Sequence, residues 1–123
     1  MDVLGLDHAA IKTVRLEETR RFFEEVLNLS VGPRPDFDFP GYWLYAGGRD
    51  VVHLVQTDAA KTPSQVASIN HFALRVADID AAAADLSARG VAFEREDTPG
   101  GELHQLYITD PNGVRIELNA PGG

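Results

Sequence analysis

The chain has 123 residues, of which 44% are hydrophobic, and this suits one soluble domain with a hydrophobic core. Its formal net charge of −8 argues against nucleic acid or an anionic membrane as a partner. There is no cysteine, so disulfides are excluded and any metal site must use His, Asp or Glu. No apolar run has the length of a signal peptide or a membrane span. We therefore expect a soluble, cytoplasmic protein.

The chain contains an internal repeat. Residues 6–12 (LDHAAIK) and 69–75 (INHFALR) share a His, an Ala two residues later and a cation two residues after that. The two His are His8 and His71, and the two cations are Lys12 and Arg75. Apolar residues alternate in both segments, which predicts strands. A repeat of this length indicates two copies of one structural module.

The first module continues with a helix and three strands. Residues 16–27 carry apolar side chains at helical spacing and charged ones on the opposite face, with Asn28 in position to end the helix. Strands are predicted at 30–34, 42–46 and 51–56, and residues 47–50 (GGRD) form the hairpin between the last two.

The second module follows the same order. Residues 80–89 predict a helix that Asp78 or Asp80 can cap and that ends at Gly90. Strands are predicted at 91–95, 103–109 and 114–119, with a turn at 110–113 (DPNG).

Both halves therefore read βαβββ, and the predicted class is α+β. Module 1 spans about 4–57, a polar linker spans 57–68, and module 2 spans about 69–120, all within a single domain over 1–123. Because one such unit cannot cover its own sheet, we expect the two mixed sheets to form a curved half-barrel around a metal cleft.

Four candidate metal ligands occupy matched module positions: His8, His53, His71 and Glu117. Each pair joins the first strand of a module to its last strand. A carboxylate between Ile116 and Leu118 is costly to bury without a partner, and a metal is one such partner. Three nitrogens and one oxygen suit Fe, Mn, Co, Ni or Zn, with positions left for water or substrate. We therefore expect one divalent metal per site.

The chain resembles the vicinal oxygen chelate superfamily, which includes glyoxalase I, extradiol dioxygenases and the fosfomycin- and bleomycin-resistance proteins. The resemblance covers about residues 4–120 and rests on the His8 strand, on residues 71–76 (HFALRV) and on residues 110–118 (DPNGVRIEL). It implies that His8, His53, His71 and Glu117 bind the metal. It also implies that the metal chelates a small substrate through two oxygens and stabilises an oxyanion.

The resemblance favours a glyoxalase-like isomerase or lyase that acts on a small, chelating, oxygenated substrate. Glyoxalase I usually has Glu where this chain has His53, but His can also act as a base because its pKa lies near neutrality. An Fe(II) extradiol dioxygenase is the alternative, since residues 106–117 resemble its signature, including Tyr107. A drug-binding resistance protein is a further alternative. His53, Glu117 and Tyr107 are the expected catalytic residues.

Substrate contacts are predicted on both modules. Five of the ten aromatic residues lie between positions 33 and 45, either packed beneath a long loop or forming an apolar lid, with Trp43 as the expected contact. Lys12 and Arg75 either hold a substrate carboxylate or are exposed strand ends, and Arg115 is expected to bind substrate with them. His104 has no repeat partner, so a surface role and a pocket role both stay open.

The resemblance also implies a homodimer. Single-domain relatives commonly build each site from two subunits, so His8 and His53 of one chain would meet His71 and Glu117 of the other. A site within one chain is the alternative, and nothing in the linker from Thr57 to Ser68 excludes it.

Overall fold

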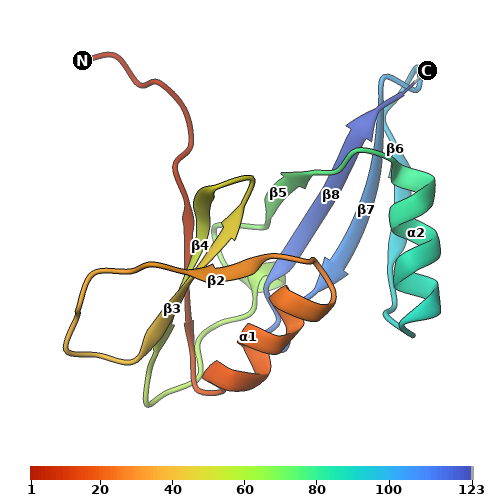
Figure 1. The fold of residues 1–123 in the computed structure, drawn as a ribbon. Helices are drawn as coiled ribbons and strands as arrows, with labels where there is room; N and C mark the ends of the chain where they lie inside the picture. Colours follow the sequence, from red (N-terminus) through yellow and green to blue (C-terminus); the bar gives the residue numbers. More distant parts are fainter. Residues whose placement is uncertain (123) are drawn as a thin grey trace. The chain divides into compact units, whose positions relative to one another are not determined.

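The computed structural model describes residues 1–122, apart from the side chain of Gln65. The chain divides into two compact units, residues 1–61 and 62–123. Each contains one helix of ten residues and a four-stranded mixed sheet. Figure 1 labels these helices and strands along the chain. The predicted α+β class with two βαβββ modules is confirmed. No helix within residues 1–122 is long and apolar enough to cross a membrane.

The first unit has its strands in the order β1-β4-β3-β2. β1 runs parallel to β4, and the other neighbours are antiparallel. The elements are β1 (Ala9–Thr13), α1 (Leu16–Glu25), β2 (Ser30–Gly32), β3 (Gly41–Ala46) and β4 (Arg49–Gln56). Gly47 and Gly48 both have positive φ, as a two-residue hairpin between β3 and β4 requires.

The second unit repeats this topology with the order β5-β8-β7-β6, in which β5 is parallel to β8. A short 3-10 turn, η1 (Ser64–Val66), precedes the sheet. The other elements are β5 (Phe72–Arg75), α2 (Ile79–Ala88), β6 (Glu94–Asp97), β7 (Leu103–Thr109) and β8 (Arg115–Pro121).

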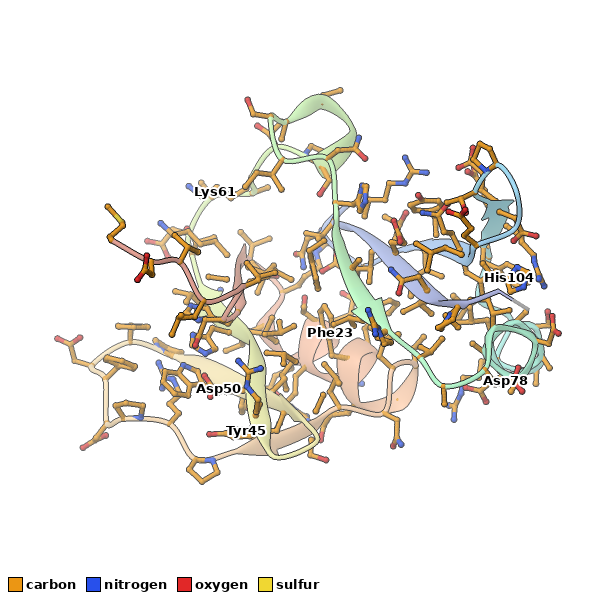
Figure 2. The ribbon with its side chains drawn as sticks, turned by 90° about the horizontal axis from the view of Figure 1, so that it is seen from above. Phe23, Tyr45, Asp50, Lys61, Asp78 and His104 are labelled. Carbon is orange, nitrogen blue, oxygen red and sulfur yellow. The ribbon has the colours of Figure 1, made fainter. Side chains whose placement is uncertain are left out.

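Each helix packs against one face of the sheet in its own unit. Phe23 of α1 is fully buried, as are Leu44 and Val52 on the strands, and Figure 2 shows Phe23 in the interior of this unit. In the second unit, Leu86 of α2 is 2% exposed, and Leu106 and Ile116 of the sheet are fully buried. Because strand side chains alternate between faces, the residues between these core positions lie on the helix-free face.

The ends of several elements differ from the sequence prediction. His8 and His71 both precede their strands, because strand pairing begins at Ala9 in β1 and at Phe72 in β5. β2 ends at Gly32 because the following Pro33 has no N–H to donate to a strand ladder. Alternation of side chains predicts extended backbone, but it does not show where the partner strand stops pairing.

The helix ends follow the predicted capping residues. Asn28 and Gly90 both adopt positive φ after their helices. The N–H of Val91 donates to the carbonyl of Leu86, so Val91 serves as part of the helix end and β6 begins only at Glu94, later than predicted. Of the two candidate N-caps, Asp78 is the one whose side chain accepts from the first helical N–H groups.

We expect Phe23→Ala to destabilise the protein by about 3–5 kcal/mol, because it leaves a cavity in a fully buried position. Its neighbour Phe22, whose ring meets that of Phe23 edge to face, is only half-buried. Phe22→Ala is therefore the matched control and should cost less. Urea unfolding followed by circular dichroism measures both, and equal losses would contradict this account of the core.

Candidate metal-binding site

His53 lies at the centre of the helix-free face of the first sheet. Its neighbours in the strand register are Ala10 on β1 and Trp43 on β3. The rings of His53 and Trp43 stack with their centroids 4.0 Å apart. His8, two residues before Ala10, stacks on His53 at 3.7 Å. The small Ala10 side chain leaves this part of the face open.

Aspartates orient both imidazoles. Asp7 Oδ1 lies 2.7 Å from Nδ1 of His8, and Asp50 Oδ2 lies 2.6 Å from Nε2 of His53; Figure 2 labels Asp50 near the start of β4. The hydrogen bond from His53 lowers the pKa of Asp50 below its ordinary value. These contacts leave Nε2 of His8 and Nδ1 of His53 available to a ligand.

The stacked arrangement keeps the two imidazoles from binding one ion in their present orientations. A ring nitrogen binds a metal through a lone pair in the ring plane. The planes of His8 and His53 are 17° apart, so their lone pairs run nearly parallel. One of the two rings must therefore turn before both can bind the same ion.

Glu117 lies at the equivalent place on the second sheet. Its neighbours in the register are Ala73 on β5 and Tyr107 on β7. Nε2 of His71 is 3.2 Å from Oε1 of Glu117. Asn70 Oδ1 lies 2.8 Å from Nδ1 of His71, so the other ring nitrogen faces the carboxylate. The pair His71 and Glu117 therefore presents one nitrogen and one carboxylate together.

Glu117 is an ionised carboxylate in a buried position, with its side chain only 7% exposed. Burial by itself raises the pKa of Glu117. Hydrogen bonds from Asn119, Gln105 and Tyr107, together with the charge on His71, outweigh burial and hold this pKa below its ordinary value. The Asn119 amide is 2.7 Å from Oε2, and the Tyr107 hydroxyl is 3.1 Å from Oε1.

Tyr107 and Arg115 lie beside Glu117. Burial and the Glu117 charge raise the pKa of Tyr107, so its hydroxyl stays protonated and donates to the carboxylate. The Arg115 guanidinium stands 4.1 Å from the centre of the Tyr107 ring. A cavity of about 280 Å³ opens here, lined by Val91, Ala92, Phe93, Glu94, Tyr107, Ile108, Thr109 and Arg115.

The remaining predicted site residues lie on different faces of their sheets. Lys12 is exposed on the same face as Ala10, and Arg75 is exposed on the same face as Ala73. His104 projects to the opposite face of β7 from Tyr107, because odd and even positions alternate along the strand. Its Nδ1 lies 3.0 Å from Asp97 on β6, and Figure 2 shows it near α2. His104 is therefore not part of the Glu117 cluster.

The sequence reasoning missed the residues that orient the imidazoles. Asp7 and Asn70 each stand directly before the repeated His and each hydrogen-bonds its Nδ1. Their shared position in the repeat was the signal that could have identified them. The sequence pattern places Asp50 only in the hairpin, because a contact between Asp50 and His53 depends on the local strand geometry rather than on a motif.

The donor chemistry of both pairs fits a divalent transition metal. Imidazole nitrogens with the second ring nitrogen hydrogen-bonded, and an ionised carboxylate held by amides, are typical of such ligands. Within residues 1–122 the structure has no group of three or more His, Cys, Asp or Glu side chains arranged to hold an ion. The candidate ligands instead form one pair in each unit: His8 with His53, and His71 with Glu117.

Fold and site together define a duplicated βαβββ protein with a His-containing polar cluster on the helix-free face of each sheet. The chain belongs to the Glyoxalase/Bleomycin resistance protein/Dioxygenase superfamily, whose family model matches residues 5–118. No curated protein sequence matches it significantly.

Solved structures with the same fold cover nearly the whole chain. A Bacillus anthracis protein described as a glyoxalase family member is 24% identical, with a TM-score of 0.83 and 98% of each chain covered. An integron cassette protein from the Halifax Harbour metagenome is 26% identical, with a TM-score of 0.79, and 96% of this chain and 99% of that chain are covered.

A mutant of FosX, a fosfomycin resistance protein from Listeria monocytogenes, is 18% identical to this chain with a TM-score of 0.76. The match covers 98% of this chain and 94% of that chain. That structure contains Mn(II) and 1S,2S-dihydroxypropylphosphonic acid.

Proposed function

We propose that this protein is a divalent-metal-dependent enzyme of the superfamily, a glyoxalase-like isomerase or lyase that acts on a small substrate with two chelating oxygens. The observation that supports this best is the equivalence of the two donor pairs. His53 and Glu117 hold matching register positions, each opposite a small Ala on the parallel neighbour strand. Each of them also meets the repeated His of its own module, His8 or His71.

We assign Nε2 of His8, Nε2 of His71 and the Glu117 carboxylate as metal ligands, with His53 as the fourth ligand or the base. The metal is Fe, Mn, Co, Ni or Zn, and Mn(II) is the natural first probe because the FosX structure contains it. When bound, such an ion acts as a Lewis acid that stabilises an oxyanion on the substrate.

The proton-transfer role is assigned to His53. With Nε2 hydrogen-bonded to Asp50, its Nδ1 keeps the lone pair that can accept a proton from the substrate and return it elsewhere. Asp50 holds the ring orientation and stabilises the charged imidazolium, as a carboxylate does behind a catalytic His. This arrangement takes the place of the Glu that glyoxalase I usually has at this position.

The other polar residues of the two faces bind and orient the substrate. The Tyr107 hydroxyl, which donates to Glu117, keeps that carboxylate in place and can donate to a substrate oxygen instead. Lys12, Arg75 and Arg115 are cations on the same faces as the donor pairs, and they suit a substrate carboxylate.

We further propose that the protein is a homodimer in which each site combines two chains. Each unit supplies only two of the four donors, so a complete set of ligands needs both pairs. Under this proposal, His8 and His53 of one chain act together with His71 and Glu117 of its partner.

Metal-loaded protein should convert hemithioacetals without consuming oxygen, and a chelator should abolish the reaction. The assay compares Mn(II)-, Ni(II)-, Zn(II)- and Fe(II)-loaded protein on hemithioacetals and on catechols, with an oxygen electrode in parallel. Oxygen-dependent cleavage of catechols would reverse the ranking in favour of a dioxygenase. Tight binding of bleomycin or fosfomycin without turnover, and unaffected by chelator, would instead identify a drug-binding protein.

A further inference from the structure

A set of stacked aromatic rings extends outward from His53. Trp43 stacks on His53, and the ring of Phe37 lies 6.4 Å from that of Trp43. Phe37 in turn stacks on Phe39 with the centroids 4.9 Å apart. We call Phe37, Phe39 and Trp43 the aromatic platform. It begins beside the proposed base and ends in the loop between β2 and β3.

The outer two rings of the platform are exposed although they are apolar. Phe37 is 42% exposed and Phe39 is 39% exposed, so neither ring is buried as core packing requires. The other two aromatics of this segment do have structural roles: the Tyr42 hydroxyl donates to Glu17 of α1, and the Tyr45 hydroxyl donates to the carbonyl of Pro33. The segment therefore contains two structural tyrosines, two exposed rings, Phe37 and Phe39, and the half-buried Trp43 that stacks on His53.

Arg34 orders the loop that carries the platform. Its Nη2 donates to the carbonyl of Phe39 at 2.9 Å, and its guanidinium lies 5.1 Å from the ring centres of both Phe37 and Phe39. A cation held over two rings reduces their freedom, so a ligand that stacks on them meets an ordered surface.

We propose that the aromatic platform binds a planar aromatic group of the substrate, the same molecule whose oxygens chelate the metal. This inference rests on the proposed function and specifies its substrate class. We infer an aromatic substrate group because the platform is continuous with the proposed metal ligands. Trp43 at one end of the platform stacks on His53, and His53 stacks on His8. A substrate whose aromatic group is attached to the chelating oxygens can therefore contact the platform and the metal at the same time.

Two hydroxamates test this, because they share one chelating group and differ in the group attached to it. Benzohydroxamate carries a phenyl ring, whereas acetohydroxamate carries a methyl. In Mn(II)-loaded protein, we expect benzohydroxamate to bind about tenfold more tightly than acetohydroxamate. The gain comes from stacking of its phenyl ring on the platform and from burial of the ring's apolar surface. The chain has a single tryptophan, so Trp43 fluorescence reports occupancy of the platform directly, and calorimetry gives the affinities.

Two variants distinguish an effect of the platform from a general effect on the sheet. The double variant Phe37→Ala/Phe39→Ala should lose the preference for benzohydroxamate and keep its affinity for acetohydroxamate. Tyr42→Leu is the matched control, because it removes a neighbouring ring of β3 on the opposite face, and it should keep the preference.

The outcomes distinguish this inference from the function on which it rests. If both hydroxamates bind equally and Trp43 fluorescence is unchanged, the platform assignment is wrong, while metal chelation stands. If neither hydroxamate binds the Mn(II)-treated protein and Trp43 fluorescence stays constant, the proposed metal site is wrong, and the platform assignment fails with it. Loss of preference in Tyr42→Leu as well would show a general effect of folding and would also overturn the platform.

Discussion

Replacing Glu117 by Gln is expected to lower the affinity for Mn(II) by about 100-fold or more. The substitution removes the ionised carboxylate and keeps the size of the side chain, so the buried position stays filled. Residues that merely orient a ligand are worth roughly 10- to 100-fold in metal affinity, and Glu117 is proposed as a ligand itself. Titration of metal-free protein with Mn(II), followed by calorimetry, measures the change.

Glu102→Gln is the matched control. Glu102 is exposed in the turn before β7, so this substitution removes the same charge away from the site. Its Mn(II) affinity should equal that of the wild type. Thermal unfolding of both variants, without metal, shows whether Glu117→Gln folds normally. An Mn(II) affinity unchanged in a folded Glu117→Gln protein would remove this residue from the ligand set.

Mixing two variants that have each lost metal binding should restore it if each site is shared between two chains. His8→Ala and Glu117→Ala each damage both sites of their own dimer. In a mixed dimer, one site carries both lesions and the other is intact, so about half of the wild-type Mn(II) binding returns for that species. The measurement is Mn(II) binding after the two proteins are reversibly dissociated and reassembled together.

His71→Ala mixed with Glu117→Ala is the control for this experiment. Both residues belong to the same donor pair, so every site of the mixed dimer keeps one lesion and no recovery is expected. Recovery of Mn(II) binding in this control would show that one of the two variants had not lost Mn(II) binding completely. No recovery with His8→Ala would favour sites within single chains, and a monomer in light scattering would exclude sharing before the mixing.

Local signals in the sequence were sufficient for the modules and their turns. The repeat of His, Ala and cation at 8–12 and 71–75 predicted two modules, and the two modules have the same topology. Asn28 and Gly90 were predicted to end their helices, and both have positive φ. These features depend on neighbouring residues, whose backbone preferences act in the same way wherever the segment lies.

The surroundings of the candidate ligands were decided by the tertiary structure. Spacing in the sequence suggested His8 with His53 and His71 with Glu117, but strand register alone decides that Trp43 and Tyr107 flank them. Register is set by contacts between segments far apart in the chain, and a shift of one residue would turn each side chain to the other face. His104 shows the same dependence, since its position on the α2 face follows from where β7 pairs.

By itself, the sequence determined the duplicated βαβββ order, the superfamily resemblance and the identity of the candidate donors, because periodicity, turn residues and motifs are encoded locally. The tertiary structure decided which groups orient those donors and which aromatics face outward. The contacts of Gln105 and Tyr107 with Glu117 bring together residues of β7 and β8, and they arise only when these strands are paired. Burial and hydrogen bonding set the charge of a carboxylate, and both are properties of the folded chain.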